Sequence, residues 1–268
     1  GGELLATSTK TNFLTFIGSG PVGWYLNSKV SPGTRVALEH GGVAPVIVEP
    51  DADIEDMIPA LAKGGFYHAG QVCVSVQRIY VHESIFDTVA NKLAAAASKL
   101  VVGNQLDPKT EVGPLINNDE VNRVEEWVND AVTKGATILT GGKRIGASCF
   151  EPTVILNPSE DAIVSQKEVF GPVVCIYSYK TFDEAIARAN SLEVSFQAAV
   201  FTKNLDSALK AVKRLNATAV MVNDHTAFRV DWMPFGGARV SGLGMGGIPH
   251  SMEEMSNEKM MVIKSPVL

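Results

Sequence analysis

The 268-residue sequence has few cysteines, little charge and no long apolar run. Its three cysteines, Cys73, Cys149 and Cys175, are an odd and sparse set that excludes a disulfide framework and fits a reducing compartment. The sequence lacks the run of about 18 apolar residues that a membrane span needs, and residues 1–12 lack the layout of a secretory signal. We therefore predict a cytoplasmic protein that does not bind a membrane.

The composition is that of a globular protein, with 46% hydrophobic and 19% charged residues. The formal net charge is −6, and the lysines and arginines are scattered along the chain. Nucleic-acid binding is not expected, because neutralising phosphates requires clustered basic side chains. A small molecule is the predicted partner.

Short apolar runs alternate with segments of helical periodicity, which predicts an α/β fold. The predicted strands are 12–17, 33–39, 45–49, 78–82, 173–179, 198–202, 219–223 and 259–264. The predicted helices are one that includes residues 24–29, one that extends toward residue 64, and four at 84–96, 119–134, 182–192 and 205–215. Asp51 or Asp53, Ser84 and Asn118 are candidate N-caps, and Trp127 is among the apolar residues predicted to be core.

A glycine-rich turn follows the first predicted strand. Gly18-Ser-Gly-Pro-Val-Gly23 matches the G-x-G-x-x-G pattern of a dinucleotide site, in which glycines let backbone N–H groups at a helix N-terminus approach a pyrophosphate. Glu39, at the end of the next strand, would then hold the adenosine ribose. The alternative is a tight strand-to-helix turn that binds nothing.

One cysteine has an unusual setting. His68-Ala-Gly-Gln-Val-Cys73 places a thiol among small and flexible residues, which predicts an exposed thiolate on a tight turn. Backbone N–H groups near such a turn lower the pKa of a thiol and stabilise an oxyanion. Cys149 and Cys175 lie in or beside apolar runs and are predicted to be core residues. Because a lone loop cysteine is more often structural than catalytic, these residues alone favour a structural role for Cys73.

Five motifs resemble those of the aldehyde dehydrogenase superfamily, in the same order and across nearly the whole chain. They are Phe16-Ile-Gly18-Ser19 with Gly23, Ala37-Leu-Glu39-His-Gly-Gly42, Gly70-Gln-Val-Cys73, Lys167-Glu168-Val-Phe170-Gly-Pro172 and Met233-Pro-Phe-Gly-Gly237. The resemblance implies an aldehyde-dehydrogenase-like catalytic domain with an open α/β sheet, joined to the last part of a Rossmann-type coenzyme domain. Residues 1–40 would be that coenzyme-domain remnant, 41–240 the thiol-bearing catalytic domain, and 241–268 a return segment with an oligomerisation strand.

The resemblance also implies a reaction, the NAD(P)-dependent oxidation of an aldehyde to a carboxylic acid. Cys73 is then the nucleophile that forms a thiohemiacetal and a thioester. Glu39 becomes the general base that activates the hydrolytic water, which replaces its role as a ribose ligand.

The implied coenzyme is NAD or NADP, and the choice between them stays open. The resemblance places Gly18, Ser19 and Gly23 at the pyrophosphate. Glu168 would bind the nicotinamide-side ribose, and Phe170 would pack against that end of the coenzyme.

Three residues depart from the family pattern without removing a chemical role. His40 follows the glutamate in place of leucine, Val43 replaces a common lysine, and Val74 follows the nucleophile. His40 either tunes the glutamate or the coenzyme pocket, or it is a packing variant.

Arg229 is the candidate substrate-binding residue. The segment Phe228-Arg-Val-Asp-Trp-Met233 resembles relatives that handle small anionic or hydroxylated aldehydes, so we hypothesise that Arg229 binds an anionic tail. The alternative is an ion pair with Asp231 or another acid, and Val72 stands where phosphate-handling relatives often have arginine.

Members of the family are much longer than this chain. We therefore expect the chain to begin within the coenzyme domain, to have an N-terminal half of the same enzyme as a partner, and to oxidise aldehydes poorly by itself. Two alternatives stay open: a thiol esterase that works without coenzyme, and a catalytically incomplete fragment that serves assembly. A homo-oligomer, dimer or tetramer, is expected, with 259–264 as the pairing strand.

Overall fold

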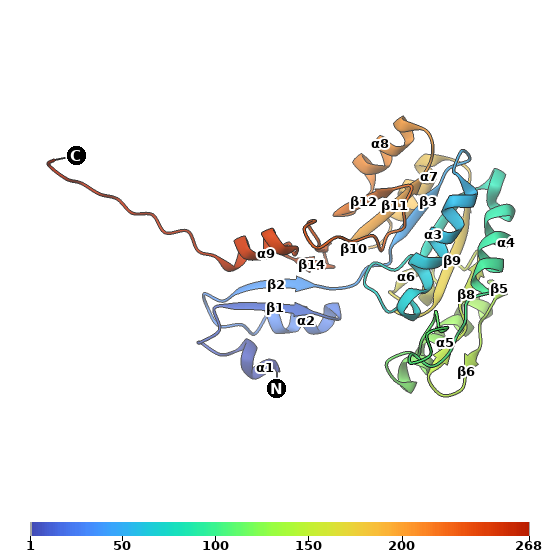
Figure 1. Ribbon diagram of the computed structural model, residues 1–268, viewed down its shortest axis with the longest axis horizontal. Helices are drawn as coiled ribbons and strands as arrows, with labels where there is room; N and C mark the ends of the chain where they lie inside the picture. The colour runs from blue at the N-terminus through green and yellow to red at the C-terminus, as the bar shows by residue number, and fades with distance from the viewer. Residues whose placement is uncertain (1, 268) are drawn as a thin grey trace.

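The computed structural model describes residues 2–267, and its largest feature is a seven-stranded sheet (Figure 1). The strand order is β12-β11-β3-β4-β9-β8-β5, and every neighbouring pair is parallel except β5 with β8. The strands are β3 (Pro45–Val48), β4 (Arg78–His82), β5 (Thr137–Thr140), β8 (Thr153–Leu156), β9 (Val173–Tyr179), β11 (Gln197–Phe201) and β12 (Ala219–Val222). The prediction of an α/β fold with an open sheet is confirmed.

A smaller sheet carries the N-terminal segment and receives the chain again near its end. Its strands are β1 (Phe13–Ile17), β2 (Arg35–Glu39) and β14 (Gly242–Leu243), with β1 parallel and β14 antiparallel to β2. Two short antiparallel pairs complete the strands: β6 (Arg144–Ile145) with β7 (Cys149–Phe150), and β10 (Val194–Ser195) with β13 (Ala238–Arg239). The smaller sheet lies beside the larger one, and the connection from β2 to β3 joins them (Figure 1).

The helices are α1 (Gly2–Ala6), α2 (Gly20–Asn27), α3 (Ile54–Phe66), α4 (Phe86–Ala97), α5 (Asn118–Thr133), α6 (Ile163–Gln166), α7 (Phe182–Ala189), α8 (Leu205–Arg214) and α9 (Ile248–Met255), with 3-10 turns η1 (Tyr67–Gly70) and η2 (Glu83–Ile85). Helices α2 to α8 occupy connections between strands, whereas α1 precedes β1 and α9 follows β14. Among the described residues, no helix combines the length and the apolar character needed to cross a membrane.

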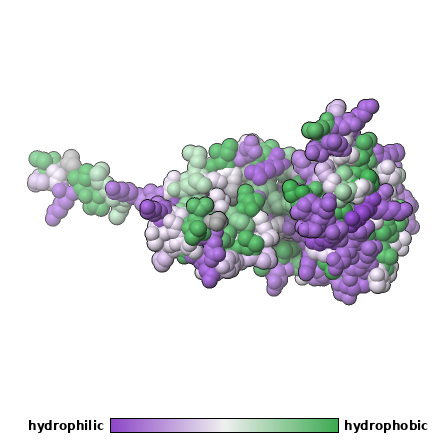
Figure 2. All heavy atoms as spheres, turned by 90° about the horizontal axis from the view of Figure 1, so that it is seen from below, coloured by the Kyte–Doolittle hydropathy of each residue, from purple (hydrophilic) through white to green (hydrophobic). Residues whose placement is uncertain are grey.

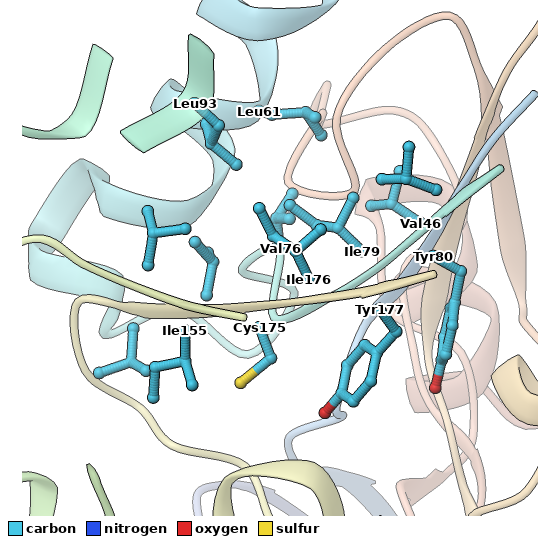
Figure 3. Close-up of a cluster of buried hydrophobic side chains, with 14 of the residues drawn as sticks. Val46, Leu61, Val76, Ile79, Tyr80, Leu93, Ile155, Cys175, Ile176 and Tyr177 are labelled. Carbon is cyan, nitrogen blue, oxygen red and sulfur yellow. The ribbon is translucent and has the colours of Figure 1, made fainter. Parts of the chain in front are cut away.

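Helices cover both faces of the larger sheet. In Figure 3, Leu61 of α3 and Leu93 of α4 lie on the same side of the strands as Ile79 of β4. Tyr80, the next residue along β4, points to the opposite side, where the guanidinium of Arg188 in α7 lies 5.0 Å from the centre of its ring. Because strand residues alternate between faces, β4 is buried on both, as a parallel sheet requires.

The predicted helix starts lie close to the observed ones, but the capping groups differ. Asp53 precedes α3, yet its carboxylate makes no capping hydrogen bond. Ser84 lies inside η2, and α4 begins only after that turn. Asn117, not Asn118, caps α5, where its side chain accepts the N–H of Glu120 at 3.0 Å. Helical periodicity locates a turn of helix but does not say which neighbouring polar residue reaches a free N–H group.

Residues 259–264 form no strand within the part of the chain that the structure describes. The segment extends away from both sheets beyond α9 (Figure 1), and Figure 2 shows hydrophobic side chains along this arm. Its apolar residues, Met260 to Ile263, are 63–85% exposed. The strand prediction is wrong for the single chain, because a strand needs a partner for its backbone hydrogen bonds and the segment points away from the chain's own sheets.

We expect Leu61→Ala to lower the free energy of unfolding by about 2–5 kcal/mol, because Leu61 is 0% exposed and its loss leaves a cavity between α3 and the sheet. Leu205→Ala is the matched control: Leu205 is 72% exposed on α8, so the expected change is within about 0.5 kcal/mol. Equilibrium unfolding in urea, followed by circular dichroism, measures both. An equal decrease in the free energy of unfolding in the two variants would contradict this account of the core.

Candidate active site

The two candidate catalytic side chains meet between the sheets. Glu39 is the last residue of β2, and Cys73 lies in the loop between η1 and β4. The Cys73 thiol donates to Oε1 of Glu39 across 4.0 Å, although the residues are 34 positions apart in sequence. The N–H of Gly42 donates to the Cys73 carbonyl at 3.2 Å, which fastens the two segments to each other.

The turn before Cys73 is built from left-handed backbone. His68, Ala69 and Gly70 have φ values of 50°, 54° and 69°. A Cβ atom on Gly70 would lie 2.0 Å from the carbonyl oxygen of Gly171, so only glycine fits there. The tight turn expected from the small residues is present, and it packs directly on the segment that follows Phe170.

A small apolar cluster, separate from the main core, holds the loop that carries Cys73. Its buried members are Val74, Phe196, Ala227 and Phe235. The hydroxyl of Thr226 also donates to the Val74 carbonyl at 2.7 Å. The valine after the nucleophile, one of the departures from the family pattern, is therefore a packing residue.

Burial first, and then the nearby Glu39 and Glu168 carboxylates, raise the pKa of the Cys73 thiol to about 12. The Cys73 backbone N–H and Arg229 act in the opposite direction but more weakly. Burial likewise raises the pKa of Glu39, against the attraction of Arg229. The prediction of an exposed thiolate with a lowered pKa is wrong for this state, because the turn presents its N–H in a half-buried site shared with two acids.

A cavity of about 650 Å³ opens over the sulfur. It is lined by Ile17, Gly18, Ser19, Glu39, His40, Gly41, Gln71, Val72, Cys73, Ile116, Glu120, Arg123, Trp127, Glu168 and Phe170. Four of the five candidate coenzyme residues thus share one hollow with the thiol and the glutamate. The fifth, Gly23, lies behind the turn.

Gly23 makes room for the ring of His40. A Cβ atom at Gly23 would lie 1.9 Å from Cε1 of that ring. The imidazole is 2% exposed, its Nδ1 is 3.0 Å from the Gly18 carbonyl oxygen, and its Nε2 is buried without a hydrogen-bond partner. Ser19 stands at the N-cap of α2 but makes no side-chain capping bond. His40 therefore packs and fastens the glycine turn.

The Glu168 carboxyl is turned inward onto Gly41. A Cβ atom on Gly41 would lie 1.9 Å from each carboxyl oxygen, and Oε1 is buried without a partner. Burial raises the Glu168 pKa to about 8, opposed by Arg123 and by the Gly42 N–H. Phe170, with a strained φ of 46°, is 41% exposed. The residues fit a dinucleotide, since a ribose hydroxyl would supply the donor that Oε1 lacks.

The far wall of the cavity comes from α5. The guanidinium of Arg123 lies 4.5 Å from the centre of the Trp127 ring, and both side chains line the cavity. Trp127, predicted to be a core residue, packs against the main core but is only partly buried, because it lies at the border of the apolar stripe. An arginine four positions before a tryptophan on one helix face is the sequence signal for such a stack.

Arg229 points toward the other side of Glu39. Its guanidinium lies 4.0 Å from the centre of the Phe235 ring, and within residues 2–267 it has no acidic partner at ion-pair distance. The alternative of a pair with Asp231 is therefore wrong. Arg229 and Glu39 both line a second cavity of about 190 Å³, together with Glu254 of α9.

Comparison with known sequences identifies relatives over almost the whole chain. The family profile described as aldehyde dehydrogenase family matches residues 1–261. A 3-sulfolactaldehyde dehydrogenase from Priestia megaterium is 44% identical over 262 residues, which cover 98% of this chain and 54% of the relative. A lactaldehyde dehydrogenase from Methanocaldococcus jannaschii is 43% identical over 98% of this chain and 56% of the relative. The chain thus spans about half the length of these curated relatives.

Solved structures resemble the chain equally well. Glyceraldehyde-3-phosphate dehydrogenase from Methanocaldococcus jannaschii, complexed with NADP, has a TM-score of 0.92 and 42% identity, covering 96% of this chain and 55% of that one. Aldehyde dehydrogenase 21 from Physcomitrella patens, in complex with succinate, has a TM-score of 0.91 and 39% identity, covering 95% and 53%. The chain belongs to the aldehyde dehydrogenase family.

Proposed function

We propose that the chain carries the catalytic thiol and base of an enzyme that oxidises an aldehyde to a carboxylic acid with NAD or NADP. The observation that carries this proposal is the 4.0 Å contact between Sγ of Cys73 and Oε1 of Glu39 inside a cavity that also contains the glycine turn. The relative from Methanocaldococcus jannaschii was solved with NADP, which supports a nicotinamide coenzyme.

Cys73 is protonated at rest, so the first step is removal of its proton. Oε1 of Glu39 already accepts the hydrogen bond from the thiol, and the carboxylate takes that proton as sulfur bonds to the carbonyl carbon. The carbonyl π electrons move to oxygen, and the Cys73 backbone N–H stabilises the resulting oxyanion. The product is a thiohemiacetal on Cys73.

A bound nicotinamide ring in its oxidised form supplies the acceptor for the hydride. Loss of hydride from the thiohemiacetal carbon leaves a thioester on Cys73. Glu39 releases to solvent the proton that it took from the thiol, and its carboxylate then removes a proton from water as the water oxygen bonds to the thioester carbon. The thiolate leaves and takes back a proton from Glu39. One aldehyde and one water become one carboxylic acid, one hydride passes to the coenzyme, and one proton is released to solvent.

The coenzyme-side residues have distinct tasks. Ser19, at the N-cap of α2, presents its backbone N–H group to a pyrophosphate. The Gly18 N–H donates to the Glu39 carbonyl at 3.0 Å and joins the turn to β2, and Gly23 admits the His40 ring that holds this turn. Glu168 offers its unpartnered oxygen to a ribose hydroxyl, and Phe170 closes the same end of the cavity.

The substrate is proposed to be a short aldehyde with an anionic tail. Among residues 2–267 Arg229 has no ion-pair partner, and it lines a cavity that Glu39 also lines, so a carboxylate, phosphate or sulfonate there would pair with it beside the proposed base. The relative from Priestia megaterium is named for an aldehyde with a sulfonate group, which supports this class.

Self-association is proposed through the extended segment 259–264. The segment combines exposed apolar side chains with a lysine at each end, and a second copy of the chain would supply the strand partner that the segment lacks.

We expect Cys73→Ala to abolish aldehyde-dependent formation of NADH or NADPH, a loss of at least about 1000-fold, because no other group can form the thioester. The assay uses the chain alone and a chimera carrying the N-terminal half of the Priestia megaterium relative before residue 1. Cys149→Ala, outside the cavity, is the control and should retain activity. If the chain instead hydrolyses esters at a rate that does not depend on coenzyme, and forms no NADH or NADPH from aldehydes, the thiol esterase would be favoured.

Glu39→Gln is expected to slow hydrolysis of the thioester about 100-fold or more, because a carboxamide cannot deprotonate water. Burial raises the Glu39 pKa above its usual range, so in the unmodified protein activity should fall as the pH drops through that raised value, where the base becomes protonated. Single-turnover kinetics across pH would show both effects. A variant with the parent's pH profile would remove Glu39 from the base role.

Arg229→Leu should lower kcat/KM for anionic aldehydes about 10- to 100-fold and leave neutral aldehydes nearly unchanged, because a charge-assisted contact is lost. Arg144→Leu is the control, since Arg144 pairs with Glu125 outside both cavities. Equal preference between charged and neutral aldehydes before and after the Arg229 substitution would exclude it as a binding residue for the tail.

A further inference from the structure

Gln77 makes three hydrogen bonds to the segment that carries Glu168. Its Nε2 donates to the carbonyls of Val164 and Lys167 at 2.8 Å each, and its Oε1 accepts the N–H of Val169 at 2.9 Å. The side chain is 5% exposed. One carboxamide therefore fixes the backbone immediately before and immediately after Glu168.

The backbone of Gln77 is itself held rigidly. Its N–H donates to the Ala44 carbonyl at 3.3 Å, and its carbonyl accepts the N–H of Cys175 at 2.8 Å. The residue thus lies between β3 and β9 at the start of β4, and four positions after Cys73. A carboxamide anchored in this way cannot follow the Glu168 segment if the segment moves.

We propose that Gln77 is a positioning residue for Glu168, holding the carboxyl against Gly41 within the cavity that contains Cys73. The consequence for catalysis rests on the function proposed above, because Glu168 is there the ribose-binding residue. No motif of the sequence points to Gln77, which lies between the nucleophile loop and a strand.

The inward position of Glu168 is costly without such an anchor. Its Oε1 is buried with no partner, and its neighbours in the cavity include the acidic Glu39 and the thiol of Cys73. A buried carboxylate without a hydrogen-bond partner lowers its free energy by moving into water. Arg123 on the facing helix α5 and the Gly42 N–H attract it. If Gln77 releases the segment, we expect the carboxyl to swing outward into the open part of the cavity.

The reactivity of the Cys73 thiol depends on the position of Glu168, and it can be measured without coenzyme or turnover. Three charged side chains shift the pKa of the thiol: Glu39 of β2 and Glu168 raise it, and Arg229 lowers it. Tyr67 lies beside the thiol, and its own pKa is raised first by burial and then by Cys73. At about pH 9.5 the Glu168 carboxyl, whose pKa is about 8, is ionised and the thiol is mostly protonated. Moving the negative charge away then increases the thiolate fraction.

The experiment measures the alkylation rate of Cys73 by iodoacetamide at about pH 9.5, with site-resolved mass spectrometry. Glu168→Gln removes the charge and should raise the rate about 3- to 10-fold, the effect of a pKa shift of up to about one unit. Gln77→Met keeps the length of the side chain without its hydrogen bonds and should raise the rate by a similar factor. The double variant should react no faster than Glu168→Gln alone, because the two changes act through one charge.

Gln197→Met is the matched control, because Gln197 is a glutamine of β11 that is 2% exposed and does not line the cavity. The alkylation rate of Cys73 in Gln197→Met should equal the rate in the parent protein. Cys175, which is 0% exposed, reports unfolding in every variant. If Gln77→Met exposes Cys175, Gln77→Leu takes its place, since it also lacks the donors and the acceptor and adds no charge.

Three results would overturn the proposal. The first is a parent-like Cys73 rate in Gln77→Met while Glu168→Gln reacts faster. The second is additive acceleration in the double variant. The third is alkylation of Cys175 in both Gln77 variants, which would mean that Gln77 holds the whole sheet. Because alkylation requires neither coenzyme nor aldehyde, each result is distinguishable from failure of the proposed oxidation.

Discussion

The structure depends on holding three acidic groups in one partly dry cavity. The Cys73 thiol and the Glu39 and Glu168 carboxyls each have a pKa raised first of all by burial. In water these side chains would separate, since their negative charges repel one another and are better solvated apart. Their proximity is therefore imposed by the backbone, and much of the surrounding architecture serves that purpose.

The backbone supports are polar groups buried where a sequence pattern would place apolar ones. Arg78 is 1% exposed, donates to the Val43 carbonyl at 3.1 Å and to the Ala189 carbonyl at 3.1 Å, and so ties the segment after Glu39 to the C-terminal end of α7. The negative end of the helix dipole makes this a favourable place for a cation. Together with Gln77, Arg78 makes the start of β4 a rigid platform beneath the cavity.

Glu39 stands between two hollows. It lines the cavity of about 650 Å³ with the glycine turn and the cavity of about 190 Å³ with Arg229. In the proposed function, a base in this position would meet reactants that arrive from opposite sides. The return of the chain as β14, paired with β2, completes the wall of the smaller cavity and explains why a short segment near the C-terminus belongs to the first sheet.

The sequence by itself determined the α/β class, the positions of five of the seven strands in the larger sheet, and the family, because apolar periodicity and short motifs depend on local chemistry; β5 and β8 were not predicted. It named Cys73, Glu39 and Glu168 as candidates, but it gave the thiol the wrong ionisation and did not show that Trp127 also lines the cavity. Only the tertiary structure decided those properties, and it alone revealed Gln77 as a partner of the Glu168 segment. The reason is physical: burial, charge proximity and hydrogen bonds between segments some 90 residues apart are set by packing, which no local pattern records.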